Sequence, residues 1–420
     1  MKVNEFISAV KAGEYDDSLT QLYGIRRLDA QRNRYENAAA KFYASFGNKD
    51  IIVLSVPGRT ELLGNHTDHN GGKVLASAID VDLIGVASLD TNIHLRGSGD
   101  INIDINNLAP DEDGEGSVAS LVRGVVDAYS RCGLNYGGFD LYTLSDIKSG
   151  IGVSSSASFA ILIGFVLSKL YNGGSVSPLA LAMFAKYAEN VHFGKECGIM
   201  DQISCGYGGT VYMDLKREDY PVVKYVNVDF SKFSHRMYLI DTKSSHRTLS
   251  DYYSAVSEEM RAVARVFGKQ RLCDVAEEDV FTDIKLVRKK CGDRPVLRAM
   301  HFFEENRRVE KQMENLEKGD FNGYLDLVRE SGDSSFKLLQ NIYAFPNEQQ
   351  ISLALALAER SGVVARVHGG GFGGTIQCYV SPDKEAGFLA LMRRTFGENA
   401  CLKVNIGRKG AVEIRKEGIV

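Results

Sequence analysis

Alternating and continuous apolar runs predict a first half rich in β-strands. The run at residues 51–56 predicts a buried strand that Pro57-Gly58 ends, because this dipeptide marks a turn. An apolar run at 157–171 follows three serines and predicts a Ser-capped, mostly buried helix; Ser177-Pro178 opens another that runs to about His192. Further strands are predicted at 74–79, 81–87, 101–105, 138–143, 210–214, 222–228 and 236–241.

Beyond residue 248 the apolar positions mostly follow a helical period. This period predicts helices at 249–267, 297–318, 324–341 and 347–360, with Gly362 as the C-cap of the last. Strands are predicted at 363–367 and 375–380, and residues 402–406 and 411–414 are predicted to close a sheet. The pattern indicates an α+β fold. A chain of 420 residues exceeds one ordinary core, so we expect two domains, 1–235 and 236–420.

Composition excludes several classes of protein. The chain has 50 basic and 54 acidic residues, so no basic field is available for nucleic acid or an anionic membrane. No apolar run approaches the roughly 18 residues that span a bilayer, and the first eleven residues lack the apolar core of a signal peptide. The odd count of seven cysteines, without C-x-x-C, argues against a disulfide framework and against zinc. We therefore expect a cytoplasmic protein.

Glycine is enriched, at 42 of 420 residues, and three loops account for part of the excess. The first, at 56–72, also holds Arg59, Glu61, His66, Asp68 and His69, a mixture that favours a functional loop over a plain polar turn. The second, at 148–158, places two glycines and three serines before the predicted helix. Inward backbone N–H groups and the helix dipole would make it a phosphate cradle, and the hydroxyls can ligate Mg²⁺.

The third loop, at 366–374, contains G-x-G-x-x-G, but residues 375–380 read as a strand rather than the helix that a dinucleotide site requires. We therefore reject a Rossmann site, and the Walker A pattern is also absent from the sequence. Between the second and third loops, Asp201 follows the apolar stretch 197–200. An acid there needs a partner, and with Arg59 as that partner Asp201 would be a base.

Together these segments resemble the galactokinase family of the GHMP kinase superfamily. The first loop is similar to the signature Gly-Arg-x-Asn-x-x-Gly-Glu-His-Thr-Asp-Tyr-Asn-x-Gly, and residues 148–156 are similar to the motif Pro-x-Gly-x-Gly-Leu-Ser-Ser-Ser. Residues 197–202 match Cys-Gly-x-Met-Asp-Gln, and residues 366–374 resemble the third motif of the superfamily. The motifs stand in the family's order.

The resemblance implies a two-domain GHMP kinase fold. Its N-terminal domain would be ribosomal protein S5 domain 2-like and its C-terminal domain ferredoxin-like α/β, with the active site between them. The implied reaction is ATP-dependent phosphorylation of galactose at the anomeric C1 hydroxyl, with Mg²⁺ as cofactor. Sugar and ATP would be the only partners, and a monomer is expected.

The resemblance also implies roles for individual residues. Asp201 matches the catalytic aspartate, and Arg59 the arginine that holds it ionised. The other matched positions are sugar contacts at Asn65, His66, Asp68, Gly198 and Tyr253, ATP-phosphate contacts at Gly150, Gly152, Ser154, Ser155 and Ser156, and Mg²⁺ ligands at Ser156 and Glu189.

The chain departs from the first-loop signature at three positions and from the second motif at Lys148. Glu61 stands where the family has Asn, Asn65 where it has Glu, His69 where it has Tyr, and Lys148 where it has Pro. The glutamate that matches Asn65 ordinarily contacts the C6 hydroxyl of the sugar. An amide there would not repel a uronic acid, so galacturonate or another galactose-like sugar stays an alternative substrate.

Two other classes were weighed. A non-catalytic sugar sensor is disfavoured because Arg59, Asp201 and the three serines are all present. A zinc hydrolase is suggested by residues 66–69, His-Thr-Asp-His, but Gly64 stands where the zinc motif needs its first histidine.

Overall fold

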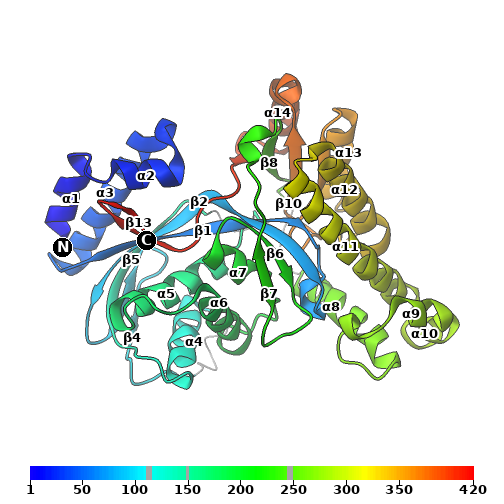
Figure 1. Ribbon diagram of the computed structural model, residues 1–420, viewed down its shortest axis with the longest axis horizontal. Coiled ribbons are helices and arrows are strands. Elements are labelled where there is room, and N and C mark those ends of the chain that lie inside the picture. Colours follow the sequence, from blue (N-terminus) through cyan, green and yellow to red (C-terminus); the bar gives the residue numbers. More distant parts are fainter. Residues whose placement is uncertain (110–115, 148–150, 244–248) are drawn as a thin grey trace.

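Two β-sheets organise the chain, here described from a computed structural model for residues 1–109, 116–147, 151–243 and 249–420 (Figure 1). Within these ranges nine strands form the larger sheet, in the order β13-β12-β1-β2-β5-β3-β4, with β6 paired to β2 and β7 to β6. The strands are β1 (Ile52–Leu63), β2 (Lys73–Leu89), β3 (Ile93–Arg96), β4 (Ile101–Ile103), β5 (Phe139–Ser145), β6 (Thr210–Asp214), β7 (Val222–Tyr225), β8 (Arg236–Asp241), β9 (Val364–His368), β10 (Thr375–Val380), β11 (Cys401–Val404), β12 (Val412–Arg415) and β13 (Gly418–Ile419).

Helices cover both faces of the larger sheet and one side of the smaller one (Figure 1). They are α1 (Val3–Lys11), α2 (Asp16–Tyr23), α3 (Leu28–Phe46), α4 (Val118–Arg131), α5 (Ser155–Tyr171), α6 (Pro178–Tyr187), α7 (Met200–Tyr207), α8 (Ser250–Val266), α9 (Glu277–Thr282), α10 (Ile284–Cys291), α11 (Asp293–Lys318), α12 (Phe321–Ser334), α13 (Gln350–Arg360) and α14 (Pro382–Phe396). The π-helical turns η3 (Ala188–His192) and η6 (Ser335–Leu339) extend α6 and α12.

The first glycine loop connects β1 to β2 and contacts helix α11 of the second half. The prediction that Pro57-Gly58 ends the first strand is wrong: β1 continues to Leu63, and the register with β2 shifts between Pro57 and Arg59. A bulge accommodates a proline because the irregular ladder does not need its missing N–H. A Cβ at Gly58 would lie 2.7 Å from the Val153 carbonyl oxygen, so glycine lets the second loop approach this strand.

Alternate residues of β1 and β2 face two separate cores. Leu54, Val56 and Leu83 pack with α4–α7, whereas Val53 and Ile84 pack with α1–α3 on the opposite face. The sequence analysis assigned no element to residues 1–50, so its description of the first half as β-rich is incomplete. No helix was predicted at α4, α7, α9, α10 or α14 either.

The smaller sheet has the order β11-β8-β10-β9, and its strands are antiparallel. Along the chain it reads strand, helices, two strands, helix, strand, which is the ferredoxin-like arrangement. This topology confirms the predicted class of the second half. Among the described helices none is long and apolar enough to cross a membrane.

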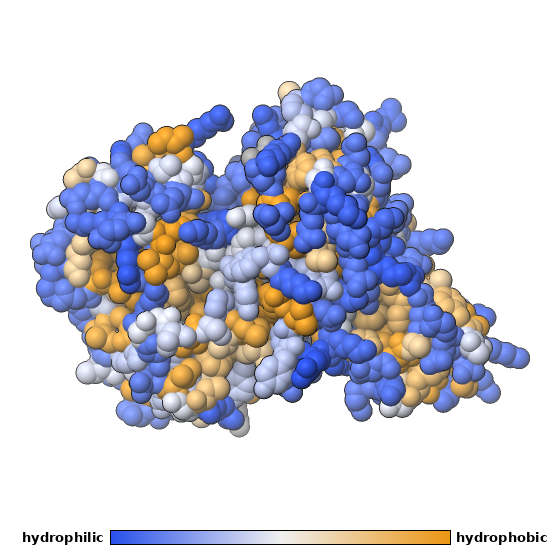
Figure 2. Space-filling view, viewed as in Figure 1, coloured by the Kyte–Doolittle hydropathy of each residue, from blue (hydrophilic) through white to orange (hydrophobic). Residues whose placement is uncertain are grey.

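The end of the chain returns to the larger sheet. Glu413 of β12 pairs with Leu54 of β1, and β13 pairs with β12 (Figure 1). The division at residues 235–236 stays a prediction, and the strand pair β12–β13 crosses it. Hydrophilic side chains dominate the face drawn in Figure 2, where apolar ones emerge in small groups. Exposed apolar side chains include Phe281 on α9, and Ile284 and Leu286 on α10.

Candidate active site

One cavity of about 320 Å³ gathers the residues to which the sequence analysis assigned catalysis or sugar binding. Its lining includes Arg59, Asn65, His66, Asp68, Gly198, Asp201 and Tyr253. The first six precede residue 235, whereas Tyr253, Gly369 and Gly370 come from the second half. The cavity therefore lies where the two predicted domains meet.

Arg59 and Asp201 form a bidentate ion pair at this cavity. Arg59 Nε lies 2.7 Å from Asp201 Oδ1, and Nη2 lies 2.8 Å from Oδ2. The third guanidinium nitrogen, Nη1, donates to the carbonyl oxygen of Gly152 in the second glycine loop. The sequence prediction that Asp201 has a partner, and that the partner is Arg59, is confirmed as geometry. Two parallel bonds fix the carboxylate's plane as well as its charge.

Asp201 is held in its ionised form. Burial alone would raise its pKa, but Arg59, Lys195 and the hydroxyl of Ser154 more than offset that effect and hold the pKa of Asp201 below its usual range. Ser154 donates to Asp201 Oδ2, and its backbone is left-handed, with φ of 62°. The predicted Ser cap of α5 is therefore wrong in detail: Ser154 precedes the helix, but its hydroxyl turns to Asp201 instead of the helix amides.

The second glycine loop lies beside this pair. Gly152 has a φ of 73°, and Ser155 and Ser156 begin α5, with the helix N-terminus close to Arg59 and Asp201. A helix N-terminus with free N–H groups favours an anion. The predicted phosphate contact Gly150, together with Lys148, lies outside the described residues.

The predicted metal ligands are adjacent. The Ser156 hydroxyl donates to Glu189 Oε1, while Gln202 donates to Oε2 of the same carboxylate. Glu189 lies on the π-helical turn η3 and is buried. One hydroxyl and one carboxylate are hard oxygen donors that suit Mg²⁺, which keeps most of its waters and needs few protein ligands. The donor chemistry therefore fits the ion.

Asp68 and Gly198 lie against each other in the lining of the cavity. A Cβ at Gly198 would lie 1.7 Å from Asp68 Oδ2, so any side chain there would displace the carboxylate. Burial, together with the Asp201 and Glu61 carboxylates, raises the pKa of Asp68 to about 6. The backbone amide of His69 donates to Asp68 Oδ1 over 2.9 Å, and within the described part of the chain no lysine or arginine forms an ion pair with it.

The two histidines of the first loop are uncharged at neutral pH. Burial lowers the pKa of His66 to about 4 and holds that of His69 well below its ordinary value. His66 Nε2 lies 2.8 Å from the carbonyl oxygen of Gly370, which ties the first loop to the third. Tyr253 reaches the third loop too, donating to the Gly371 carbonyl over 3.0 Å.

Asn65 and Glu61, two of the departures from the family motifs, contact each other. Asn65 Nδ2 lies 3.2 Å from Glu61 Oε1 and 2.7 Å from the Gly369 carbonyl, and Asn65 Oδ1 accepts from Asn341 over 2.8 Å. Glu61 pairs with the buried Arg366 at 2.6 Å. Both the amide nitrogen and the amide oxygen of Asn65 therefore form hydrogen bonds within the protein. The carboxylate that contacts this amide belongs to Glu61 on β1.

Side chains of helix α11 form hydrogen bonds with the backbone of the first loop. Glu305 accepts from the backbone amide of Gly64 at 3.0 Å and from Ser331 at 2.7 Å, and His301 lies 2.8 Å from the Asn65 carbonyl. The sequence analysis missed these residues, along with Arg366 and Lys195 as site residues. Glu305 and His301 are four positions apart, so they share a helix face, but nothing in that spacing shows which loop they grip.

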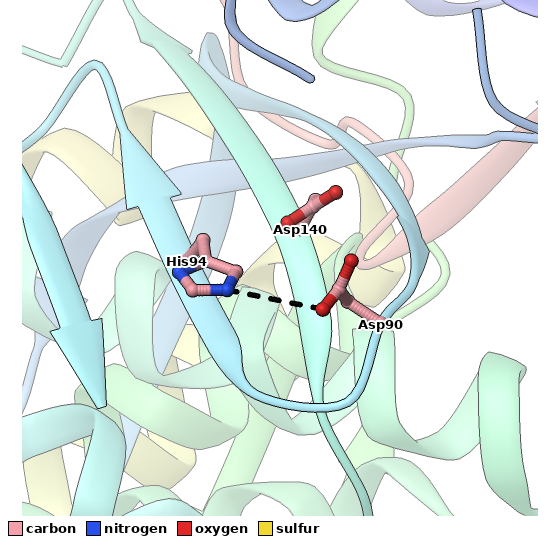
Figure 3. Close-up of side chains that lie close together, drawn as sticks. All are labelled: Asp90, His94 and Asp140. Carbon is pink, nitrogen blue, oxygen red and sulfur yellow. Dashed lines mark ion pairs between the residues drawn. The ribbon is translucent and has the colours of Figure 1, made fainter. Parts of the chain in front are cut away.

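The zinc hypothesis finds no support at His66 and His69. Among the described residues one group has the geometry for a metal, Asp90, His94 and Asp140, with His94 on β3 and Asp140 on β5 (Figure 3). None of the three lines the cavity. Lys49 already bridges its carboxylates, with Nζ 2.5 Å from Asp90 Oδ2 and a shorter contact to Asp140. A protein ammonium thus neutralises these acids.

The chain has the fold of the GHMP kinases. It is similar to the structure of Lactococcus lactis galactokinase complexed with galactose, with a TM-score of 0.77 and 24% identity over 89% of this chain and 97% of that one. It is also similar to mevalonate kinase from Methanococcus jannaschii, with a TM-score of 0.60 and 16% identity over 86% and 99% of the two chains. A family model for the GHMP kinases N terminal domain matches residues 120–209. The predicted fold class is confirmed.

Sequence comparison narrows the class. A model described as the galactokinase galactose-binding signature matches residues 40–89. Galactokinase from Streptococcus thermophilus is 30% identical over 372 residues, covering 85% of this chain and 92% of that protein; the Streptococcus suis galactokinase is 29% identical over 377 residues, covering 86% and 93%. The chain belongs to the galactokinase family. It is a sugar kinase, a phosphotransferase, and like other GHMP kinases it uses ATP as a substrate.

Proposed function

We propose that this chain transfers the γ-phosphoryl group of ATP to the C1 hydroxyl of galactose, giving galactose 1-phosphate and ADP. The bidentate Arg59–Asp201 pair carries the proposal. It joins the glycine–serine loop before α5 to the cavity that holds the matched sugar contacts. The membership in the galactokinase family supports the same substrate.

In the proposed step, Asp201 orients the C1 hydroxyl and accepts its proton as the C1 oxygen attacks the γ-phosphorus. The bond to the β–γ bridging oxygen breaks, and ADP leaves with that electron pair. Arg59 keeps Asp201 ionised and fixes its plane, so it acts on the base rather than on the sugar. Phosphoryl transfer depends mostly on positioning and on neutralising charge, and the cavity supplies both.

ATP phosphates would lie at the loop formed by Gly152, Ser154, Ser155 and Ser156. Ser156 and Glu189 would hold Mg²⁺, which supplies charge neutralisation to the phosphates when bound. Gln202 fixes the second oxygen of Glu189, so the first is presented toward Ser156. These assignments are part of the proposal.

The charges of the cavity favour a neutral sugar over a uronic acid. Of the cations in its described lining, Arg59 pairs with Asp201, and Lys195 lies 3.3 Å from Glu189. Asp68 adds a carboxylate without an ion-pair partner, which would repel the carboxylate of galacturonate. Asn65, the position that left a uronic acid open, is engaged by Glu61 and Asn341.

A sugar panel with ADP release as the readout tests the proposal. Galactose, galacturonate, N-acetylgalactosamine and arabinose are compared at saturating ATP and Mg²⁺, with no sugar as the blank. We expect the highest kcat/KM with galactose. Fast turnover of another sugar without turnover of galactose would reject galactose as the substrate. If none of the four sugars stimulated ADP release, the result would favour a binding role. The expected monomer and cytoplasmic location stay predictions.

A further inference from the structure

Lys195 lies between the predicted metal donors and the cavity. Its Nζ is 3.3 Å from Glu189 Oε1 and 3.4 Å from the Ser156 hydroxyl oxygen. Its side chain is 47% exposed and lines the same cavity as Arg59 and Asp201. Lys195 has no part in the proton transfer proposed for Asp201 and matches no family motif position named for the site.

The backbone of Lys195 is held while its side chain is not enclosed. Its amide donates to the Glu189 carbonyl over 2.9 Å, following the left-handed Gly194 with φ of 75°. The next residue, Glu196, is tied to α8 by Arg261 at 2.5 Å. A lysine with a fixed backbone and a flexible four-carbon side chain can move its ammonium by several ångströms without rearranging the loop.

The charged side chains around Lys195 form balanced pairs when neither phosphate nor metal is bound. Arg59 cancels Asp201, and Lys195 cancels Glu189. A divalent cation on Ser156 and Glu189 would repel the ammonium, because both are positive, and would take over its carboxylate. Lys195 would then be a cation without a partner in a cavity that must accept the transferred phosphoryl group. Phosphoryl transfer is promoted by cations placed at the equatorial oxygens of that group.

We propose that Lys195 is a catalytic residue that binds the γ-phosphate of ATP, moving from Glu189 to the phosphate when the nucleotide and its metal bind. This inference rests on the proposed function for the identity of the nucleotide. In the transfer step Lys195 neither gains nor loses a proton; it offsets negative charge on the γ-phosphoryl oxygens while the C1 oxygen bonds to phosphorus and ADP departs.

Equilibrium binding of nucleotides tests the proposal without turnover. ATP and ADP, each with Mg²⁺, are titrated calorimetrically into the full chain carrying Asp201→Asn, with and without Lys195→Met. We expect Lys195→Met to weaken ATP about tenfold or more and to change ADP less than about twofold, because only ATP carries the γ-phosphate. Lys195→Arg should restore most of the ATP affinity.

A matched control removes a nearby cation with another partner. Lys186 pairs with Glu218 at 3.0 Å and lines an adjoining cavity, so Lys186→Met should leave the ratio of ATP to ADP affinity unchanged. Thermal unfolding verifies that Lys195→Met is folded. Equal weakening of ATP and ADP, or no change in either, would overturn the role of Lys195.

Turnover separates this inference from the proposed function. In the background with Asp201 intact, Lys195→Met should lower kcat about 100-fold while the KM for sugar stays within about threefold. Absence of sugar-dependent ADP release in the unmodified chain would reject the proposed function, and the ATP-to-ADP ratio would still decide whether Lys195 recognises the γ-phosphate.

Discussion

Asp201 and Asp68 line the same cavity, yet their surroundings are opposite. Asp201 accepts two bonds from Arg59 and one from Ser154, and its pKa lies below the usual range. Asp68 accepts one backbone amide bond from His69, and burial raises its pKa to about 6. The protein therefore stabilises Asp201 as an anion, whereas the Asp68 oxygens can still accept further hydrogen bonds.

Under the proposed function, the difference separates a group prepared for proton transfer from a group prepared to bind the sugar. A half-buried carboxylate without an ion-pair partner among the described residues costs folding free energy, and such a group is a candidate for a functional site. Asp68 can satisfy its oxygens with sugar hydroxyls, whereas Asp201 needs to be ionised before the sugar arrives. Variants of these two carboxylates and of their neighbours test the difference.

Asp201→Asn removes the proposed base without removing its shape. We expect sugar-dependent ADP release to fall by roughly 10²- to 10⁴-fold, which is the range for loss of a general base, while ATP still binds. Steady-state kinetics and calorimetric titration of ATP measure the two quantities. Asp140→Asn, which alters the cluster around Lys49, is the control and should leave turnover within about twofold. Near-native turnover of Asp201→Asn would make the assignment wrong.

Arg59→Ala leaves Asp201 buried without its cation. We expect kcat/KM to fall more than about 100-fold and the acidic limb of its pH profile to move upward, because the pKa of Asp201 rises. Arg408→Ala is the matched control: Arg408 is a buried arginine paired with Asp82 at 3.0 Å. It should lower the unfolding temperature without moving the pH profile. An unshifted profile in Arg59→Ala would separate Arg59 from the ionisation of Asp201.

Asp68→Asn replaces a charged acceptor by a neutral one. We expect the KM for sugar to rise about 10- to 100-fold with a smaller change in kcat, since a hydrogen bond to a charged group contributes roughly 1.5–3 kcal/mol. The unfolding temperature at pH 7.5 should stay equal or rise, because a buried charge is removed. Gly198→Ala should reproduce the effect on KM by displacing Asp68. A decrease in kcat alone would place Asp68 in the chemical step.

The pH dependence of sugar use should report Asp68. Since its pKa is about 6, it is ionised at pH 7.5 and protonated at pH 5, so kcat/KM for sugar should fall about tenfold per pH unit below 6. Asp68→Asn should lack this limb. The raised pKa means that protonation of Asp68 stabilises the fold as the pH falls, so unfolding through this group cannot mimic the effect. A profile that is flat to pH 5 would contradict the assignment.

The smallest effect is expected from exchanging Glu61 and Asn65. Asn65→Glu alone places two buried carboxylates together and should lower stability and alter sugar preference more than kcat. The double variant Glu61→Asn/Asn65→Glu restores one carboxylate and one amide and should recover most of the stability. Thermal unfolding and the sugar panel, analysed as a double-mutant cycle, check the coupling. Additive losses would show that the two side chains act independently.

Much of the fold was predictable from local pattern. The strands β6, β8 and β10 have the predicted bounds, because short apolar runs between turn residues have few alternatives. The misses have physical causes. Pro57 and Gly58 lie inside β1, since a register shift absorbs them, and Ser154 serves Asp201 rather than α5. Helix α1 was not predicted, although Val3, Phe6 and Val10 have helical spacing, because nine residues give a short periodic signal.

The sequence by itself determined the class of chemistry, through glycine loops, the serine run and Asp201 with its expected partner Arg59. Only the tertiary structure decided which charges cancel. Glu61 pairs with Arg366 across 305 positions, and Glu305 accepts a hydrogen bond from the first loop. Lys195 pairs with Glu189, while Asp68 forms no ion pair among the described residues. Motif spacing describes neighbours along the chain, whereas the pKa and availability of a buried group depend on atoms within a few ångströms, wherever they stand in the sequence.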